Sequence, residues 1–465
     1  MREYFFEKAY VREPPRKGPR GSWQRNVLIT VDDKGYISSV KGNVSPGHQN
    51  RISGFALPGF PNSHSHAFQR VLAGRTEYKN SFKDQDNFWL WRDLMYQFAN
   101  AITPDDLRNI AGFLYLEMLK AGYTSVAEFH YLHHQPGGVP YDNPAEMSLA
   151  ILDAAEDVGL AVTHLPVLYM QGGFESQSLA EKQLRFGHDV ESFMALRNRL
   201  KDSLGKYSSH HQLGFAFHSL RAVPKSAMTE VMDIQVTAGP IHIHIAEQMQ
   251  EIEDCQNYNG QRPVEWLLSH QNVDHRWCLV HATHMTEDET AALAKSGAVV
   301  SICPTTEANL GDGFFPLKNY LNYGGRISIG SDGNSLINPC EELRWLEYGA
   351  RLVAQQRNIV ANRAEPHTGT ALFEAIQTGG AQALGQKTGA IAVGYRADII
   401  ILDGETSLSG QVPESNILDA FIFGGGRNDI KDVMVAGEWR IKARQHEAQD
   451  KIRANYEKTL ARIGV

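Results

Sequence analysis

Two histidines one residue apart, His64 and His66, follow the apolar run FALPGF and precede Gln69 and Arg70. On an extended segment, side chains two residues apart point the same way, so both imidazoles can converge on one point. A metal ion is the usual occupant of such a point, whereas histidines on a loop are often simply solvated. The pair by itself leaves both interpretations open.

A second histidine pair occurs in IHIHIAEQ, where His242 and His244 alternate with isoleucines. Both side chains would point to one side of a strand, so spacing does not say which one is a ligand. We prefer His244, because it lies nearer the C-terminal end of the run and Glu247 follows three residues later. His242 is predicted to be a hydrogen-bonded polar residue deeper in the fold.

Two further runs end in residues that can bind a metal. His281 ends the run before VHATH turns into a loop, and Asp332 lies between Ser331 and Gly333 in GSDGNS. His284 is predicted to be an ordinary loop residue. The nitrogen-rich set assembled in this way is His64, His66, His244, His281 and Asp332.

Such a set suits zinc or a similar divalent ion that keeps one position for water. The pKa of bound water then falls from about 15.7 towards about 7, which supplies hydroxide at neutral pH. A carboxylate close by can move protons between that water and a leaving group, and Glu247 is placed for this role. The set therefore predicts hydrolysis at a carbon that bears a poor leaving group.

The elements that must position these residues alternate between short apolar runs and longer helix-like stretches, the pattern of a parallel α/β fold. Eight such runs predict a (β/α)8 barrel, with a doubly wound sheet as the alternative. Seven runs carry polar residues at their C-terminal ends, where barrel enzymes keep their active sites. The runs are FALPGFPNSHSH, TSVAEFHY, AVTHLPVLY, LGFAFHSLR, PIHIHIAEQ, WCLVHATH, AVVSICPTT and RISIGSDGNS.

The two ends of the chain differ from this pattern. NVLITVDDKGYISSV predicts a hairpin, and TGAIAVGYRADIIILDG and DVMVAGEWRI have a similar glycine-punctuated β character. We predict that the N- and C-terminal flanking segments form one small β-sandwich domain. The predicted division is residues 1–55 and 389–465 for that domain, including a terminal helix, and 56–388 for the metal-dependent barrel.

The composition of the chain indicates which kind of molecule it binds. The 465 residues carry a formal charge of -8 without a long run of Lys or Arg, which argues against nucleic acid or an anionic membrane and favours a small molecule. Four dispersed cysteines suggest neither a disulfide framework nor a cysteine-bound zinc. With no signal-peptide core and no apolar stretch of membrane-spanning length, we expect a cytoplasmic protein.

The order of these motifs resembles the amidohydrolase superfamily over essentially the whole chain. Binuclear members bridge two metals with a lysine or glutamate at the end of the fourth strand, whereas LGFAFHSLR offers His218 and Arg221. This difference favours the mononuclear, deaminase-like branch. A desolvated carboxylate on a substrate must be paired, and Arg221 and Arg92 are candidates. The alternative for Arg92 is to cap a helix or face solvent, because Trp91 and Met95 show helical spacing around it.

In the residues that surround these motifs, the chain is similar to superfamily members that hydrolyse N-formimino-L-glutamate to N-formyl-L-glutamate and ammonia in histidine degradation. The resemblance implies a homodimer with one divalent ion, for which zinc is favoured over iron or manganese. It implies metal ligation by His64, His66, His244 and Asp332, catalysis by Glu247, His281 and Asp332, and substrate binding by Gln69, Arg92, Tyr131, His218 and Arg221.

Three alternatives stay open at this point. One is a related deaminase of a purine, pterin or other heterocyclic amine, which a substrate panel would distinguish. Another is a metal-binding scaffold without catalysis, although a retained Glu247 speaks against it. Finally, Glu307 and Asn309 could contact the substrate, but loop polarity explains them equally well.

Overall fold

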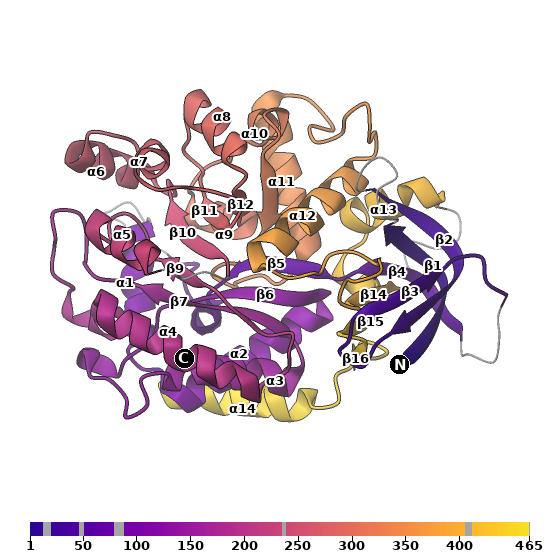
Figure 1. The fold of residues 1–465 in the computed structure, drawn as a ribbon, viewed down its shortest axis with the longest axis horizontal. Coiled ribbons are helices and arrows are strands. Elements are labelled where there is room, and N and C mark those ends of the chain that lie inside the picture. Colours follow the sequence, from indigo (N-terminus) through magenta and orange to yellow (C-terminus); the bar gives the residue numbers. More distant parts are fainter. Residues whose placement is uncertain (13–19, 46–50, 79–87, 235–238, 405–411, 465) are drawn as a thin grey trace.

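The computed structural model describes residues 1–12, 20–45, 51–78, 88–234, 239–404 and 412–464. Its centre is a sheet of parallel strands in the order β13-β12-β11-β10-β9-β7-β6-β5 (Figure 1). These strands are β5 (Phe60–Ser65), β6 (Tyr123–His130), β7 (Ala161–Leu168), β8 (Gln212–Leu213) beside β7, β9 (Phe215–Phe217), β10 (Ile241–Ile245), β11 (Trp277–His281), β12 (Val299–Ile302) and β13 (Arg326–Ile329).

The first and last strands meet at the mouth of this sheet. Ser65 forms a parallel bridge with Asp332. The amide of His66 donates to the carbonyl of Asp332, and the amide of Asp332 donates to the carbonyl of His64, both at 3.0 Å. The predicted (β/α)8 barrel is therefore confirmed, and its closing hydrogen bonds join three of the candidate metal ligands directly.

Two of the predicted strands are divided. FALPGFPNSHSH contains the end of β4 (Arg51–Pro58), which belongs to the small sheet, and then β5 of the barrel. The break lies at Gly59, where an added Cβ would lie 2.2 Å from the side chain of Thr124. The fourth barrel strand is likewise split into β8 and β9 by Gly214. An added Cβ at this glycine would lie 2.5 Å from the carbonyl oxygen of Pro240.

Helices surround the barrel, and two of them begin with a capping box. Thr286 accepts from the amide of Glu289 in a reciprocal capping box, and Thr103 with Asp106 forms another. The helices are α1 (Phe88–Ala99), α2 (Pro104–Lys120), α3 (Glu146–Val158), α4 (Val190–Ser203), α5 (Lys225–Asp233), α6 (Met249–Asn259), α7 (Pro263–His270), α8 (Glu287–Ser296), α9 (Pro304–Leu310), α10 (Leu317–Asn322), α11 (Pro339–Ala354), α12 (Thr368–Leu384), α13 (Ile417–Phe423) and α14 (Gln449–Ile463).

The flanking segments join into one small domain, as predicted. Seven strands pair in the order β16-β15-β14-β4-β1-β2-β3, and β2 and β3 form the predicted hairpin. Along β4, Phe55 and Leu57 belong to the core shared with the barrel, whereas Ala56 between them belongs to a second core inside the small domain. The remaining strands are β1 (Arg2–Arg12), β2 (Gly21–Val31), β3 (Ile37–Lys41), β14 (Ile399–Leu402), β15 (Ile430–Val435) and β16 (Glu438–Ile441).

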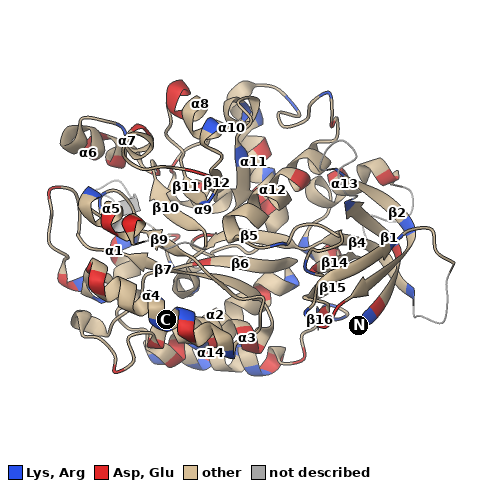
Figure 2. Cartoon of the chain, viewed as in Figure 1, with Lys and Arg blue, Asp and Glu red and all other residues tan. Residues whose placement is uncertain are grey.

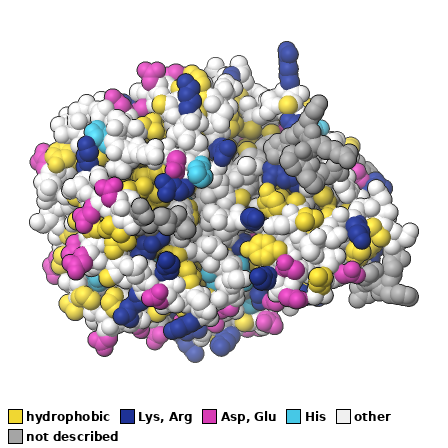
Figure 3. All heavy atoms as spheres, in the orientation of Figure 1, with side chains coloured by type: hydrophobic (Ala, Val, Ile, Leu, Met, Phe, Trp, Pro, Cys, Tyr) yellow, Lys and Arg dark blue, Asp and Glu magenta, His cyan; other side chains and the backbone are white. Residues whose placement is uncertain are grey.

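The terminal helix α14 lies against the barrel, not against the small sheet (Figure 1). The ring of Tyr456 stacks on Phe113 of α2 at 4.2 Å between centroids, and Arg462 binds Asp106 at the start of that helix. Charged side chains are frequent on outer helices such as α14, α4 and α3 (Figure 2). On the face shown in Figure 3, basic and acidic side chains are intermixed.

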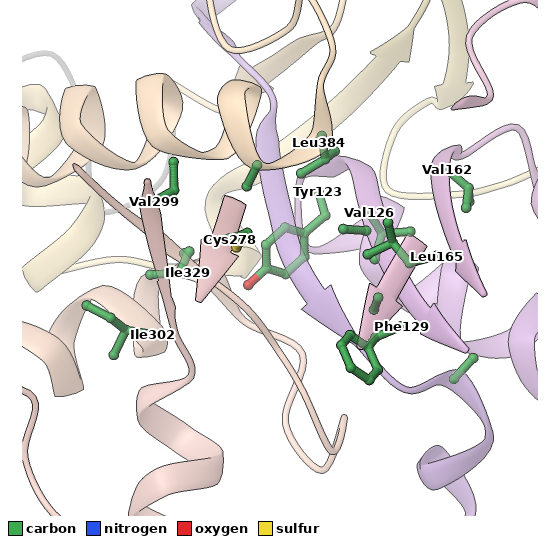
Figure 4. Packing of buried hydrophobic residues seen from close by; sticks show 14 of the residues in the cluster. Tyr123, Val126, Phe129, Val162, Leu165, Cys278, Val299, Ile302, Ile329 and Leu384 are labelled. Carbon is green, nitrogen blue, oxygen red and sulfur yellow. The ribbon is translucent and has the colours of Figure 1, made fainter. Parts of the chain in front are cut away.

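The core of the barrel is apolar and continuous. Figure 4 shows Val126, Phe129 and Leu165 of β6 and β7 close to one another, with Leu384 of α12 nearby. Each of these four side chains is fully buried. Among the helices of the described residues, none has the length and apolar character needed to cross a membrane. The packed core leaves the strand ends as the place where polar side chains gather.

Candidate active site

Four predicted metal ligands converge at the mouth of the barrel. His64 Nε2 lies 3.1 Å from His66 Nε2 and 3.1 Å from His244 Nε2. Asp332 Oδ1 lies 3.4 Å from His64 Nε2 and 3.3 Å from His66 Nε2. A tetrahedral zinc ion with bonds of about 2.0–2.1 Å would hold neighbouring donors about 3.3–3.4 Å apart. The spacing of these donor atoms therefore fits one small cation.

The hydrogen bonds of the histidine rings test this fit independently. His66 Nδ1 donates to the carbonyl of Phe129 at 2.8 Å, and His244 Nδ1 donates to the carbonyl of His218 at 3.1 Å. Burial lowers the pKa of both rings, so each keeps a single proton, and that proton is on Nδ1. Their Nε2 lone pairs therefore face each other and His64 without a proton to share, an arrangement that a bound cation stabilises.

Buried polar side chains hold the strand that carries the histidine pair. Glu128 accepts from the amide of Ala67 at 2.6 Å and from the hydroxyl of Ser65 at 2.9 Å. Asn334 donates to the carbonyl of His66 at 2.9 Å. Asp332 itself has a positive φ of 44°, a conformation tolerated by Asp and frequent at functional sites. These contacts fix the direction in which the ligand side chains point.

His281 connects the metal donors to two glutamates. Its Nδ1 donates to Glu307 at 3.2 Å, and its Nε2 lies 3.6 Å from Asp332 Oδ2 and 3.7 Å from Glu247 Oε1. Burial alone would lower the pKa of His281, but Glu247, Glu307 and Asp332 raise it well above its usual range. Burial raises the pKa of Glu247 to about 7. His281 therefore stays protonated at neutral pH, whereas Glu247 can exchange a proton there.

A cavity opens above these donors. Every predicted catalytic and substrate-binding residue lines it, and so do all predicted metal ligands except His64, which lies fully buried beneath. Gln69 donates to the hydroxyl of Tyr131 at 2.9 Å, and its carbonyl oxygen is buried without a hydrogen-bond partner. The cavity thus combines a metal-type donor set with polar groups at its wall.

Both predicted arginines border the cavity. Arg92 on α1 also lies over the ring of Tyr96, 5.6 Å from its centroid, so it belongs to the site and does not merely cap a helix. Arg221 follows β9 after His218. Burial opposes its charge, but nearby Glu251 raises its pKa, so its guanidinium stays protonated. Two cations at one wall suit an anionic ligand.

Several lining residues were absent from the sequence prediction, among them Tyr96 and Tyr169. Tyr169 directly follows β7, so the strand-end rule that selected Tyr131 could also have selected it. Tyr96 lies on α1 among apolar residues, and no local pattern distinguishes it. Glu307, which the sequence left open, binds His281, whereas Asn309 donates to Glu77 at 2.6 Å near the surface.

The two histidines predicted not to bind the metal also have structural outcomes, and His284 lies in the loop between β11 and α8. His242 donates to the carbonyl of Ala383 at 2.8 Å and is fully buried, as predicted. A second group of potential ligands, Glu156, His210 and His211, lies elsewhere, with donor atoms within 4.8 Å of one another. There His211 Nδ1 accepts from the amide of Val162 at 3.2 Å, and its Nε2 donates to Glu156 at 3.0 Å.

Comparison with known proteins places this site in a family. Residues 55–440 match the model of the amidohydrolase family. The chain belongs to the amidohydrolase family. It is 44% identical over 451 residues to formimidoylglutamate deiminase of Pseudomonas aeruginosa, with 97% of each chain covered. The sequence-based resemblance is thereby confirmed.

Solved structures agree with this placement. An amidohydrolase from Brucella melitensis superposes with a TM-score of 0.92 at 39% identity, with both chains fully covered. An adenosine deaminase from Xanthomonas campestris with bound zinc superposes with a TM-score of 0.79, covering 99% of this chain and 98% of its own, at 21% identity, and so shows the shared fold alone. The family is metal-dependent, in keeping with the donor geometry described above.

Proposed function

We propose that this enzyme hydrolyses N-formimino-L-glutamate to N-formyl-L-glutamate and ammonia with one zinc ion. The observation that carries the proposal is the cavity itself, where a metal-type donor set and two guanidinium groups face the same space. The 44% identity to a formimidoylglutamate deiminase supports the choice of substrate. Its place would be histidine degradation, in the cytoplasm, as a homodimer.

The dicarboxylate substrate explains the charges of the wall. Each buried carboxylate needs a charge-assisted hydrogen bond to offset the loss of water. Arg92 and Arg221 supply cations, and Gln69, Tyr131 and His218 supply polar groups beside them. A neutral heterocyclic amine offers no negative charge to the two guanidinium groups at this wall. The wall therefore favours an anionic amidine over a purine or pterin.

The metal would be held by His64, His66, His244 and Asp332. When bound there, it would acidify a water molecule and so supply the nucleophile at neutral pH. Asp332 Oδ2 and His281 Nε2, 3.6 Å apart, orient the attacking water towards the formimino carbon, and the Asp332 carboxylate accepts its first proton. Glu307 fixes the ring of His281 by accepting from Nδ1. A C–O bond forms, and the former double bond to the imino nitrogen becomes single.

Glu247 completes the reaction by donating a proton to the departing nitrogen. Its pKa of about 7, raised by burial, leaves it partly protonated at neutral pH, which suits a general acid. The C–N bond then breaks as the new hydroxyl gives up its proton and becomes the formyl carbonyl. Ammonia leaves with its original hydrogen and both protons of the attacking water. Glu251 holds the turn that carries Glu247 by accepting from the amide of Glu247 at 3.0 Å.

A substrate panel tests the proposal. Purified protein loaded with zinc should release ammonia from N-formimino-L-glutamate, and should release far less from adenosine or an aminopterin. The Glu247→Gln variant serves as a matched control, because it preserves the shape of the cavity. Ammonia from a ring amine, with none from N-formimino-L-glutamate, would instead assign the chain to heterocycle deamination.

A further inference from the structure

A buried glutamine links two tyrosines of the cavity wall. Gln183 Nε2 donates to the hydroxyl of Tyr96 at 3.2 Å and to that of Tyr169 at 3.0 Å. Its Oε1 accepts from the amide of Ala180 at 2.9 Å, so the amide group cannot be flipped without losing this bond. The side chain is 5% exposed. Gln183 itself does not line the cavity, whereas both tyrosines do.

This hydrogen-bond pattern determines where the tyrosine protons can point. Each hydroxyl oxygen accepts a hydrogen from Gln183, so neither tyrosine can donate back to that nitrogen. Burial raises the pKa of Tyr169, so the hydroxyl stays protonated. At least one hydroxyl proton is therefore left to donate into the cavity.

The surroundings of the pair indicate which kind of ligand would accept that proton. Arg92 lies over the Tyr96 ring, and both Arg92 and Arg221 line the same cavity as Tyr169. The ring of Tyr169 packs against His218 with centroids 4.4 Å apart. Protonated guanidinium groups beside an O–H donor form a setting for an anion, since an anion accepts from both.

We propose that Tyr96 and Tyr169 bind a carboxylate of the substrate through a hydroxyl proton whose direction is set by Gln183. The tyrosines would be substrate-binding residues, and Gln183 a positioning residue that acts through them. This inference rests on the proposed function, because it needs a dicarboxylate ligand. It explains why a glutamine outside the cavity has both its side-chain nitrogen and its side-chain oxygen hydrogen-bonded to fixed partners.

The segment that carries Gln183 is anchored firmly enough for this role. It is the short 3-10 helix Glu181–Phe186, which also carries the fully buried Arg185. The guanidinium of Arg185 donates to the carbonyl of Ile102 at 3.0 Å and to that of His134 at 2.9 Å, and it also binds the carbonyl of Ala99 at the end of α1. Gln183 is thus held relative to α1, which carries Tyr96. The amide of His188, just beyond this helix, donates to the carbonyl of Tyr169 at 3.0 Å.

Binding of glutarate, a dicarboxylate without a reactive group, tests the tyrosines in the zinc-loaded protein. By calorimetry, Tyr169→Phe and Tyr96→Phe each remove only one oxygen, and at least one of them should weaken glutarate binding about tenfold or more. Binding of butyrate, which has one carboxylate, measures how much of the loss belongs to the second carboxylate. Tyr207→Phe, which loses a hydrogen bond to Asp153 far from the cavity, should bind as the wild type does.

The direction of the proton is tested by two changes at Gln183. Gln183→Leu removes the donor, whereas Gln183→Glu replaces it with an acceptor that attracts the tyrosine protons away from the cavity. We expect a larger loss of glutarate affinity and a higher KM in Gln183→Glu than in Gln183→Leu, with kcat changed less than KM. A merely structural role predicts equal KM effects in the two variants, or parallel losses of kcat and Tm.

Glutarate affinity equal to wild type in both tyrosine variants would overturn the proposal, whatever the Gln183 variants do. This outcome can be told from a failure of the proposed function. If the wild type bound glutarate but released no ammonia from N-formimino-L-glutamate, the carboxylate site would stand and the reaction would be wrong. If the wild type did not bind glutarate at all, the carboxylate site would be refuted as well.

Discussion

Two groups of histidines in this molecule contain the same residue types but differ in how their protons are placed. At the barrel mouth, His66 and His244 donate from Nδ1 to backbone carbonyls and leave Nε2 free of a proton. In the second group, His211 accepts at Nδ1 from a backbone amide, so its Nε2 carries the proton and donates to Glu156. The partner of the far nitrogen decides whether a histidine cluster can bind a cation.

The position of each group in the barrel agrees with this difference. The first group lies at the C-terminal ends of β5 and β10. The second lies at the opposite end, where His211 immediately precedes β8 and bonds to Val162 near the start of β7. In barrels of this type, the C-terminal face carries chemistry and the N-terminal face contributes stability. Replacing a histidine of the first group should therefore affect metal binding and activity, whereas replacing one of the second group should affect stability.

The largest effect is expected for His66→Ala. Loss of one of four donors should release the metal and reduce ammonia production to background, because the water is no longer acidified. His211→Ala is the matched change in the second group and should retain both the metal and the activity. Metal analysis of the two purified variants, together with the ammonia assay, checks this. Retention of the ion in His66→Ala would break the distinction between the groups.

A second effect separates binding of the metal from proton transfer. Glu247→Gln should retain the full metal content and lose about 10²–10⁴-fold in kcat, the range for removal of a general acid–base group. Steady-state kinetics on the metal-loaded variant measure the loss. Turnover close to wild type would remove Glu247 from its assigned role while leaving the metal assignment intact.

A smaller loss is expected at Glu307, which accepts from His281 and from the amide of Cys303. Glu307→Ala should lower kcat about 10–100-fold, as does loss of other groups that orient metal-site residues. KM for N-formimino-L-glutamate should change little, because Glu307 is absent from the cavity wall. An effect on KM alone would show that it acts on the substrate after all.

A substitution in the second group should lower the stability of the fold and leave the activity unchanged. His211→Ala leaves the buried amide of Val162 unpaired, which should cost about 1–3 kcal/mol in the free energy of unfolding. Urea denaturation followed by circular dichroism measures this value. Activity per folded molecule should match wild type. An unchanged unfolding midpoint would mean that water replaces the ring at this position.

The least change is expected from Glu156→Gln, and it depends on pH. The hydrogen bond from His211 lowers the pKa of Glu156 to about 2 in the folded protein, below its ordinary value of 4.5. A carboxyl with a lowered folded pKa stabilises above its unfolded pKa, and this contribution disappears as pH falls through the folded pKa. The stability difference between wild type and Glu156→Gln should thus shrink from pH 4.5 towards 2. A difference constant over that range would contradict this account.

Much of the site followed from periodicity in the sequence. Alternation in a strand brings His64 and His66 to one side, and parallel strands bring their C-terminal ends together, so the ligand positions were predictable. The same rule placed His242 below His244. These inferences depend only on geometry that every barrel shares, and the packed barrel reproduces them.

Other features depend on contacts that no local pattern reveals. Gln183 meets Tyr96 across 87 positions of sequence. The proton position on His211 is set by the backbone of Val162, not by neighbours in sequence. The apolar run that contains Gly59 serves two different sheets, and apolar character alone cannot show where one sheet ends.

A zinc titration of chelator-treated protein tests the central claim most directly. Ammonia release from N-formimino-L-glutamate should be absent without metal, rise in proportion to added zinc, and reach its maximum at one zinc per chain. Full activity before any metal is added, or a maximum reached only after a second zinc has bound, would contradict a single catalytic cation held by His64, His66, His244 and Asp332.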